Sequence, residues 1–332
     1  MAKRKSKASD PLYGSFFKSD EEFQPIFQRY GPRLLEEQLL FHYTDSVGIS
    51  GIVERQEFWA THHECTNDFR EVQYGLDLFV KEIEERRKSQ DDNREYSLDD
   101  YFEGRAGNAN PSDVLLQLLK AMIDGKNRMI EFFIVCFSCN GDLLSQWRAY
   151  ARDASGYSLG YSAINLAKLR DHLPPGEAME LLSVIYDESD QQKHIQEVLD
   201  KLVNLFDSAT PRVIPKFRRE WVASFNAQAC KWLLATAVRL KHSGFHEEKE
   251  WRLVYPILIG QEQESAFRVM QRSSNGRLIP YVAIPVKVPI QEVWIGPKQA
   301  IQGPEKSTYP VKSLFQRKGM EPKIECSSTP YR

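Results

Sequence analysis

Residues 129–139 read MIEFFIVCFSC, an almost unbroken run of apolar, β-branched and aromatic side chains. Such a run predicts a strand buried on both faces, because a strand with one solvated face would alternate polar and apolar side chains. The strand ends near Ser138, and SQWRAYA at 145–151 follows as a short helix or turn. A sheet with this strand at its centre is therefore predicted for the fold.

Other strands and helices are predicted on both sides of this run. The expected strands are LLFHYT (39–44), EFWAT (57–61), GYSLGYS (156–162), and three successive strands at 250–260, 277–286 and 291–297. Helices are expected after Asp45, which is a typical N-cap, and in the stretches after residue 70, at 113–125 and over most of 187–241. This order lacks the regular strand–helix alternation of a doubly wound fold. It predicts an α+β domain with a mixed or split β-sheet flanked by helices.

The chain divides by composition into three expected parts. We expect an N-terminal tail and helical segment at 1–38, an α+β domain at 39–300 with a helical insertion at about 163–245, and a C-terminal extension at 301–332. Residues 88–112 are polar and rich in Gly, Asn and Asp, so we expect a mobile or partly ordered excursion there.

Charge and hydropathy exclude several classes of protein. The net charge of -2 gives no overall field toward nucleic acid or anionic lipid. No stretch reaches the roughly 20 apolar residues of a membrane helix, and the basic, polar start MAKRKSKASD is not a secretory signal. A soluble, cytoplasmic protein without a membrane partner is expected.

The cysteines and histidines predict no metal site. Five cysteines in 332 residues indicate reduced thiols. Cys136 and Cys139 have CxxC spacing, but in a strand they would point to opposite faces. His62, His63 and Cys65 fit no standard ligand spacing.

The first candidate ligand-binding residues lie in FHYTD (41–45). Because side chains alternate along a strand, His42 and Thr44 share one face and Tyr43 takes the other. A histidine at the end of a strand can hydrogen-bond a ligand, or it can bond a neighbouring backbone carbonyl. Both interpretations of His42 stay open.

Two further segments allow a binding role and a structural role. Asn67 and Asp68 are a helix-capping pair or part of a loop that folds over a ligand, in which Arg70 would face phosphates. Ser138 lies at the end of the central strand, and Trp147 and Tyr150 share one face of a helical turn. The two aromatic rings would form either a stacking wall for a planar heterocycle or part of the core.

The densest charged cluster beside a buried strand is HEEKEWRLVY at 246–255. Glu248, Glu250 and Arg252 point the same way if the segment is extended. Carboxylates are costly to bury unpaired, so these are either solvated or retained for a purpose. A carboxylate there can accept a hydrogen bond from a ribose hydroxyl and stabilise positive charge at an anomeric carbon.

Taken together, these motifs resemble a widespread bacterial domain-of-unknown-function family, number 2971. Its members share a His-Tyr-Thr start, an Asn-Asp pair with a nearby Glu, a Ser and Trp-x-x-Tyr block, and a Glu-x-Glu-Trp-Arg strand. The matching segments are FHYTD, TNDFRE, CFSCNGDLLSQWRAY with GYSLGYS, EKEWRLVY and VWIGP, spread over about 39–297. That family is in turn similar to a divergent branch of the ADP-ribosyltransferase fold.

The resemblance implies NAD as substrate and no metal. By position, His42, Tyr43 and Thr44 would hold the nicotinamide ribose end. Trp147 or Tyr150 would stack on nicotinamide beside Ser138, and Asn67 and Arg70 would complete the cofactor site. Glu250 would bond the ribose 2′-hydroxyl and stabilise the oxocarbenium-like transition state, while Glu248 would orient or deprotonate the acceptor.

The expected function is NAD-dependent ADP-ribosyl transfer to a macromolecular acceptor, either protein or nucleic acid. Such folds often serve as toxins or anti-phage effectors, for which an antitoxin-like protein partner is expected. NAD hydrolysis by the same residues is one alternative. The other is a non-catalytic module that binds a nucleotide or a partner, with Trp147 in the core.

Overall fold

The central strand of the computed structural model is β3 (Ile130–Ser138), which pairs along its whole length with β6 (Glu250–Leu258). The other edge of β3 is shared by two strands. β1 (Leu39–Thr44) meets it where Phe41 lies opposite Ser138, and β2 (Glu57–His62) meets it at Phe133 and Ile134. From this edge the sheet continues as two arms, one that begins with β1 and one that begins with β2.

Each arm continues through further strands. The first arm runs from β1 to β4 (Tyr157–Ser162), β9 (Ile290–Ile295) and β10 (Lys323–Cys326), and the second from β2 to β8 (Arg277–Pro285) and β7 (Val269–Ser274). β5 (Glu180–Ser183) pairs with the outer edge of β6. Only the β9–β10 pair is parallel among the described strands, so they form a mixed, open ten-stranded sheet. The α+β class is confirmed.

The structure describes residues 29, 33–66, 70–88, 111–124, 130–174, 178–209, 218–260, 265–274, 276–301 and 303–331. Most of the excursion expected at 88–112 lies outside these residues. None of the described helices combines the length and the apolar character that crossing a bilayer requires.

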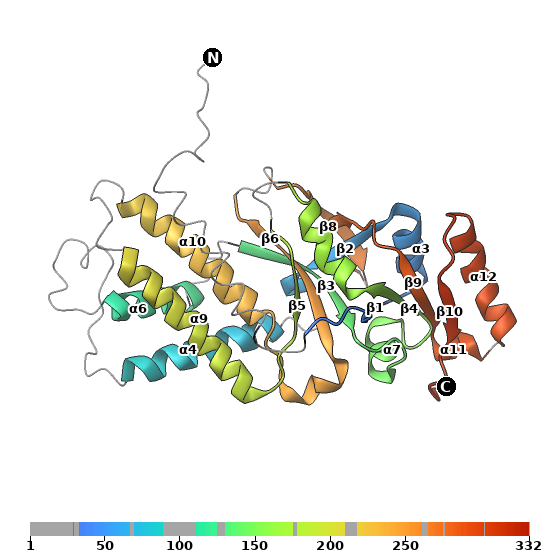
Figure 1. Ribbon diagram of the computed structural model, residues 1–332, viewed down its shortest axis with the longest axis horizontal. Helices are drawn as coiled ribbons and strands as arrows, with labels where there is room; N and C mark the ends of the chain where they lie inside the picture. The colour runs from blue at the N-terminus through green and yellow to red at the C-terminus, as the bar shows by residue number, and fades with distance from the viewer. Residues whose placement is uncertain are drawn as a thin grey trace, which may run out of the picture.

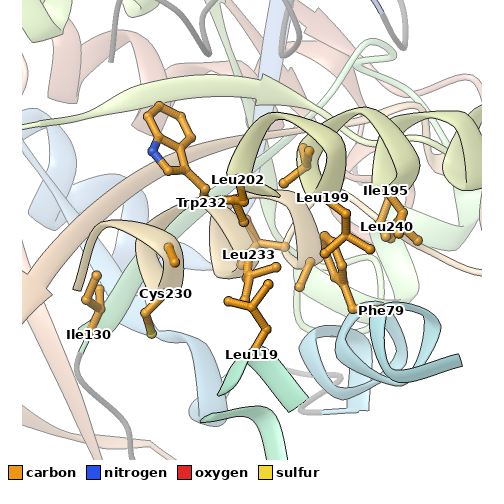
Figure 2. Packing of buried hydrophobic residues seen from close by; sticks show 14 of the residues in the cluster. Phe79, Leu119, Ile130, Ile195, Leu199, Leu202, Cys230, Trp232, Leu233 and Leu240 are labelled. Carbon is orange, nitrogen blue, oxygen red and sulfur yellow. The ribbon is translucent and has the colours of Figure 1, made fainter. Parts of the chain in front are cut away.

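One face of the sheet centre is covered by a layer of long helices at the left of Figure 1. These are α4 (Arg70–Lys88), α6 (Pro111–Asp124), α9 (Glu188–Ala209) and α10 (Arg218–Ala237). Figure 2 shows Phe79, Leu119, Leu199 and Leu233, one from each helix, meeting in their common core. Each such buried side chain contributes about 1.5–3 kcal/mol to folding. Phe132 and Ile134 of β3 add to this core from the sheet.

The opposite face of the sheet carries a second core. Phe133, Val135 and Phe137 of β3 alternate with the residues of the first core and pack here, so β3 is buried on both faces as predicted. Helices α3 (Ser46–Arg55), α8 (Ala163–Ala167) and α12 (Pro304–Gln316) cover this side. The N-cap predicted at Asp45 is confirmed, since its Oδ1 accepts the Gly48 amide at 2.8 Å.

Two of the parts expected from composition each supply a strand to the sheet. The segment at 163–245 supplies β5, and α4 and α6 of the helical layer precede β3. The segment at 301–332 is part of the sheet, because β10 pairs with β9. Short elements complete the described chain: η2 (His63–Cys65), α7 (Leu144–Tyr150), η3 (Lys168–His172), η6 (Ser243–Glu248) and α11 (Pro297–Ala300).

Candidate functional site

Four charged side chains meet in the interior where β6 begins. Glu250 is the first residue of β6 and Arg252 follows two residues later on the same face. The Arg252 guanidinium donates to both Glu250 oxygens, Nε to Oε1 and Nη2 to Oε2, each at 2.8 Å. Lys241 Nζ lies 3.1 Å from Glu250 Oε2 and 2.5 Å from Glu248 Oε2. We call Lys241, Glu248, Glu250 and Arg252 the charged cluster.

The approach to β6 is not extended, which corrects the assumption made from the sequence. Glu248 ends the 3-10 helix η6, and Lys249 then adopts a left-handed conformation with φ of 43°. The two carboxylates nevertheless converge, because both bind the ammonium group of Lys241. The ring of Phe245, which is 43% exposed, covers the buried Lys241 ammonium group, with its centroid 5.0 Å from Nζ.

The surroundings keep Glu250 ionised. Burial by itself would raise the pKa of the Glu250 carboxyl, but the charge and hydrogen bonds of Arg252, the charge of Lys241 and a hydrogen bond from the Cys136 thiol lower this pKa to about 2. The Glu250 charge also affects the pKa values of two nearby tyrosines. Burial and then the Glu250 carboxylate raise the pKa values of Tyr150 and Tyr186, so both hydroxyls stay protonated.

His42 lies away from this cluster. Its Nδ1 is 2.9 Å from the Cys136 carbonyl oxygen, at the point where β3 passes between β1 and β2. Its ring packs against Phe58 and Phe137, with centroids 5.6 and 5.8 Å away. Phe41, not His42, pairs with Ser138, so alternation places His42 on the opposite face of the sheet from Glu250. The structure does not bring His42 and Glu250 together, and His42 bonds a backbone carbonyl.

Tyr43 and Ser138 lie on the same face of the sheet as Glu250, but their hydroxyl groups form hydrogen bonds with backbone groups. The Tyr43 hydroxyl donates to the Asn140 carbonyl at 2.7 Å and accepts the Leu143 amide at 3.0 Å. Ser138 Oγ donates to the Glu248 carbonyl at 2.8 Å and accepts the Asn140 amide at 3.1 Å. These two residues hold the loop after β3 and the entry to β6 in place.

Thr44 faces a helix end. Its Oγ1 lies over Gly48 in the first turn of α3, only 1.8 Å from where a β-carbon on that glycine would be. Thr44 therefore closes the corner between β1 and α3, and a β-carbon at position 48 would fit only if the Thr44 hydroxyl moved.

Trp147 is a core residue. Its side chain is fully buried, its Nε1 donates to Asp142 Oδ1 at 2.7 Å, and its ring meets Tyr43 edge-on at 4.8 Å. No part of the ring is exposed in this structure, so of the two roles that the sequence left open for Trp147, the core position is the one observed. Of the two aromatic residues considered for stacking, Tyr150, half-buried at the end of α7, is the one influenced by the charge of Glu250.

All four residues of the charged cluster and Tyr150 lie within one segment of the chain. Residues 146–253 match the family model described as a protein of unknown function, DUF2971. His42 and Ser138 lie outside this DUF2971 match. Neither the comparison with curated proteins nor the one with solved structures finds a match.

Two residues of this site that lie within the DUF2971 match were not predicted from the sequence. Lys241 follows α10 in ATAVRLKH and Tyr186 follows β5, and neither belongs to a recognisable motif. The only indication was that Lys241 follows an apolar run, which favours a buried ammonium group with a carboxylate partner.

Other expected site residues lie apart from the cluster or outside the described chain. Asn67 is outside it, and Arg70 begins α4 but its side chain is not described. Among the described residues, no group of three or more His, Cys, Asp and Glu side chains is arranged to hold a metal ion.

The left-handed backbone at Lys249 gives a prediction about stability. Lys249→Gly is expected to raise the free energy of unfolding by about 0.5–1 kcal/mol, because glycine adopts this conformation without strain, while Lys249→Val should lower it by about 1 kcal/mol. Urea unfolding measures both. Gln56, the left-handed cap of α3, is the matched control site, since Gln56→Gly should behave like Lys249→Gly. Equal stability of the Lys249→Gly and Lys249→Val proteins would contradict the prediction.

Proposed function

We propose that the protein is an NAD-dependent ADP-ribosyltransferase that breaks the nicotinamide–ribose bond and transfers ADP-ribose to a macromolecular acceptor. The observation that carries the proposal is the ionised Glu250 carboxylate at the start of a central strand, with Glu248 and Tyr150 beside it.

The chemistry explains why these groups suit the reaction. Breaking the glycosidic bond leaves positive charge on the ribose, whereas nicotinamide departs as a neutral molecule. A fixed carboxylate beside the sugar stabilises that charge, and its loss typically lowers the rate about a hundredfold to a thousandfold. Arg252 fixes the orientation of Glu250, so the carboxylate does not need to reorganise during the reaction.

The remaining groups take supporting roles. Glu248 is the more exposed of the two carboxylates and would accept the proton of the acceptor nucleophile. The protonated Tyr150 hydroxyl would donate to the ribose or the carboxamide, and its ring would cover the nicotinamide. Lys241 bridges both carboxylates and would have to leave Glu248 before that residue could act as a base.

A non-catalytic nucleotide- or partner-binding module is the second candidate. One observation favours it: the two cations and two carboxylates of the charged cluster neutralise one another. In that case the cluster only holds β6 against the loop after α10.

The test incubates the protein with a bacterial lysate and NAD labelled in its adenylate phosphate. We expect label on macromolecules from the wild-type protein and from Glu305→Gln, an exposed control on α12, and at least a hundredfold less from Glu250→Gln and Glu248→Gln. Circular dichroism at the assay temperature establishes that each variant is folded, and digestion with protease or nuclease identifies the acceptor class.

The other outcomes separate the alternatives. Nicotinamide release without macromolecular label would favour NAD hydrolysis. Folded wild-type protein that produces neither label nor nicotinamide would contradict the transferase and leave the binding module.

A further inference from the structure

Trp59 lies on the second arm of the sheet among aromatic and basic side chains from β7, β8 and the end of α3. Tyr281 of β8 packs beside the indole, with ring centroids 4.8 Å apart and planes tilted by 38°. The guanidinium carbons of Arg55 and Arg272 lie 5.2 and 5.8 Å from the Trp59 ring centroid. We call Trp59, Tyr281, Arg55 and Arg272 the Trp59 platform.

The platform is held in a defined arrangement. Trp59 Nε1 donates to Glu57 Oε1 at 2.8 Å, which fixes the plane of the indole. Arg272 Nη2 donates to Thr61 Oγ1 at 2.9 Å, which directs this guanidinium across the sheet. Arg55 is 58% exposed and lies 3.7 Å from Glu57, so it can swing aside when a ring stacks on Trp59.

The β7–β8 hairpin concentrates positive charge in a chain whose net charge is negative. Residues 265–290 contain Arg268, Arg272, Arg277 and Lys287 and no Asp or Glu. No carboxylate in the described part of the chain forms an ion pair with Arg272. Burial lowers the pKa of Arg272, and the charges of Tyr281 and Asp45 only partly oppose this. The guanidinium therefore has a positive charge that a phosphate could neutralise.

The Trp59 platform faces the same side of the sheet as the charged cluster. Thr61 pairs with Ile134 on β3, and Cys136, two residues further along β3, hydrogen-bonds Glu250. Trp59, Thr61 and Tyr281 lie on that side by alternation and by the pairing of Thr61 with Tyr281. The helical layer covers this side of β3 at Ile134, so the Trp59 platform and the charged cluster are two separate parts of the same side of the sheet.

We propose that the Trp59 platform binds single-stranded nucleic acid. An unstacked base would lie against the half-buried Trp59 ring, which the buried Tyr281 ring supports from its side, and Arg55, Arg272 and Arg277 would contact the phosphates. Aromatic rings between arginines suit bases with a free face, whereas a duplex presents only its backbone. The binding itself is independent of NAD, and only the further step, in which this strand is the ADP-ribose acceptor, rests on the proposed function.

The experiment measures fluorescence anisotropy of labelled twelve-nucleotide RNA and DNA strands and of the matching duplexes, without NAD, at several salt concentrations. We expect the single strands to bind more tightly than the duplexes. Trp59→Leu should weaken binding about tenfold through lost stacking. Arg277→Gln, an exposed site on the same face, should reduce the slope of log affinity against log salt by about 0.7.

Lys312→Gln, an exposed site on α12, is the control with the same change in charge and should leave affinity and slope unchanged. Duplex binding as tight as single-strand binding, no binding at about 50 mM salt, or equal affinities for Trp59→Leu, Arg277→Gln and wild type would each overturn the proposal. Because NAD is absent, such a failure leaves the transferase proposal untouched. Conversely, strand binding by a protein that shows no NAD chemistry would support the platform alone.

Discussion

Replacing Glu250 by Gln is expected to lower the free energy of unfolding by about 3–5 kcal/mol, because the variant leaves the buried Arg252 charge without its carboxylate partner. Arg252 is 2% exposed and Glu250 is 5% exposed, so water cannot take over the lost interaction. Urea unfolding at pH 7 measures the change. Glu305→Gln, on the exposed side of α12, is the control and should differ from wild type by less than about 0.5 kcal/mol.

A second substitution separates a structural role from a catalytic one. Combining Glu250→Gln with Arg252→Met removes both charges and should recover most of the lost stability, since an apolar pair can replace a buried ion pair. If Glu250→Gln alone keeps the stability of the wild type while activity disappears, Glu250 acts in the reaction and contributes little to the fold.

The same ion pair predicts how stability depends on pH. The folded-state pKa of Glu250 lies below its ordinary value, so the stabilisation is fully present above that ordinary pKa and is lost as the pH falls toward the folded value. Unfolding curves of the wild-type protein should therefore lose stability between about pH 5 and pH 2. The double variant should lose less over this range.

Trp147→Ala is expected to destabilise the protein by a similar amount, about 3–5 kcal/mol. The side chain is fully buried against Tyr43, and the substitution leaves a cavity and removes one hydrogen bond to Asp142 Oδ1, which still accepts the Thr329 hydroxyl. Trp147→Phe keeps the edge-on contact with Tyr43 and should cost less. Thermal unfolding of the two variants measures the difference.

The Trp147 substitution should also loosen a distant segment. Asp142, which accepts the indole hydrogen bond, also accepts the Ser328 amide at 3.1 Å and the Thr329 hydroxyl at 3.0 Å. Amide exchange at 327–331 should therefore rise in Trp147→Ala. A variant that kept wild-type stability and exchange but no longer bound NAD would reinstate Trp147 as a stacking residue.

The strands that the sequence predicted are those whose side chains are mainly apolar. β3 and β6 lie between two cores, so most of their side chains are apolar and both strands can be recognised in the sequence. β7 was missed because VMQRSS is a largely exposed edge strand, and β5 and β10 because four-residue strands contain too little periodicity. Such strands depend on the neighbour with which they pair.

The candidate site was predictable only as separate motifs. Alternation from His42 correctly placed Tyr43 on the other face of β1, but the register between β1 and β3 decides which of them shares a face with Glu250. Residue spacing predicts neither the left-handed conformation of Lys249 nor the contact of Lys241 with the two carboxylates. Both depend on packing between segments far apart in the chain.

The position of β3 determines how the sheet can assemble. Its partners come from far along the chain: Ser138 pairs with Phe41 and Glu250, and Ile134 with Thr61. In the part of the chain that the structure describes, no local hairpin includes this strand, so it pairs only after a remote segment has reached it, which implies slow, high-contact-order folding. Until then its apolar surface is exposed, and self-association of the nascent chain competes with folding at that stage.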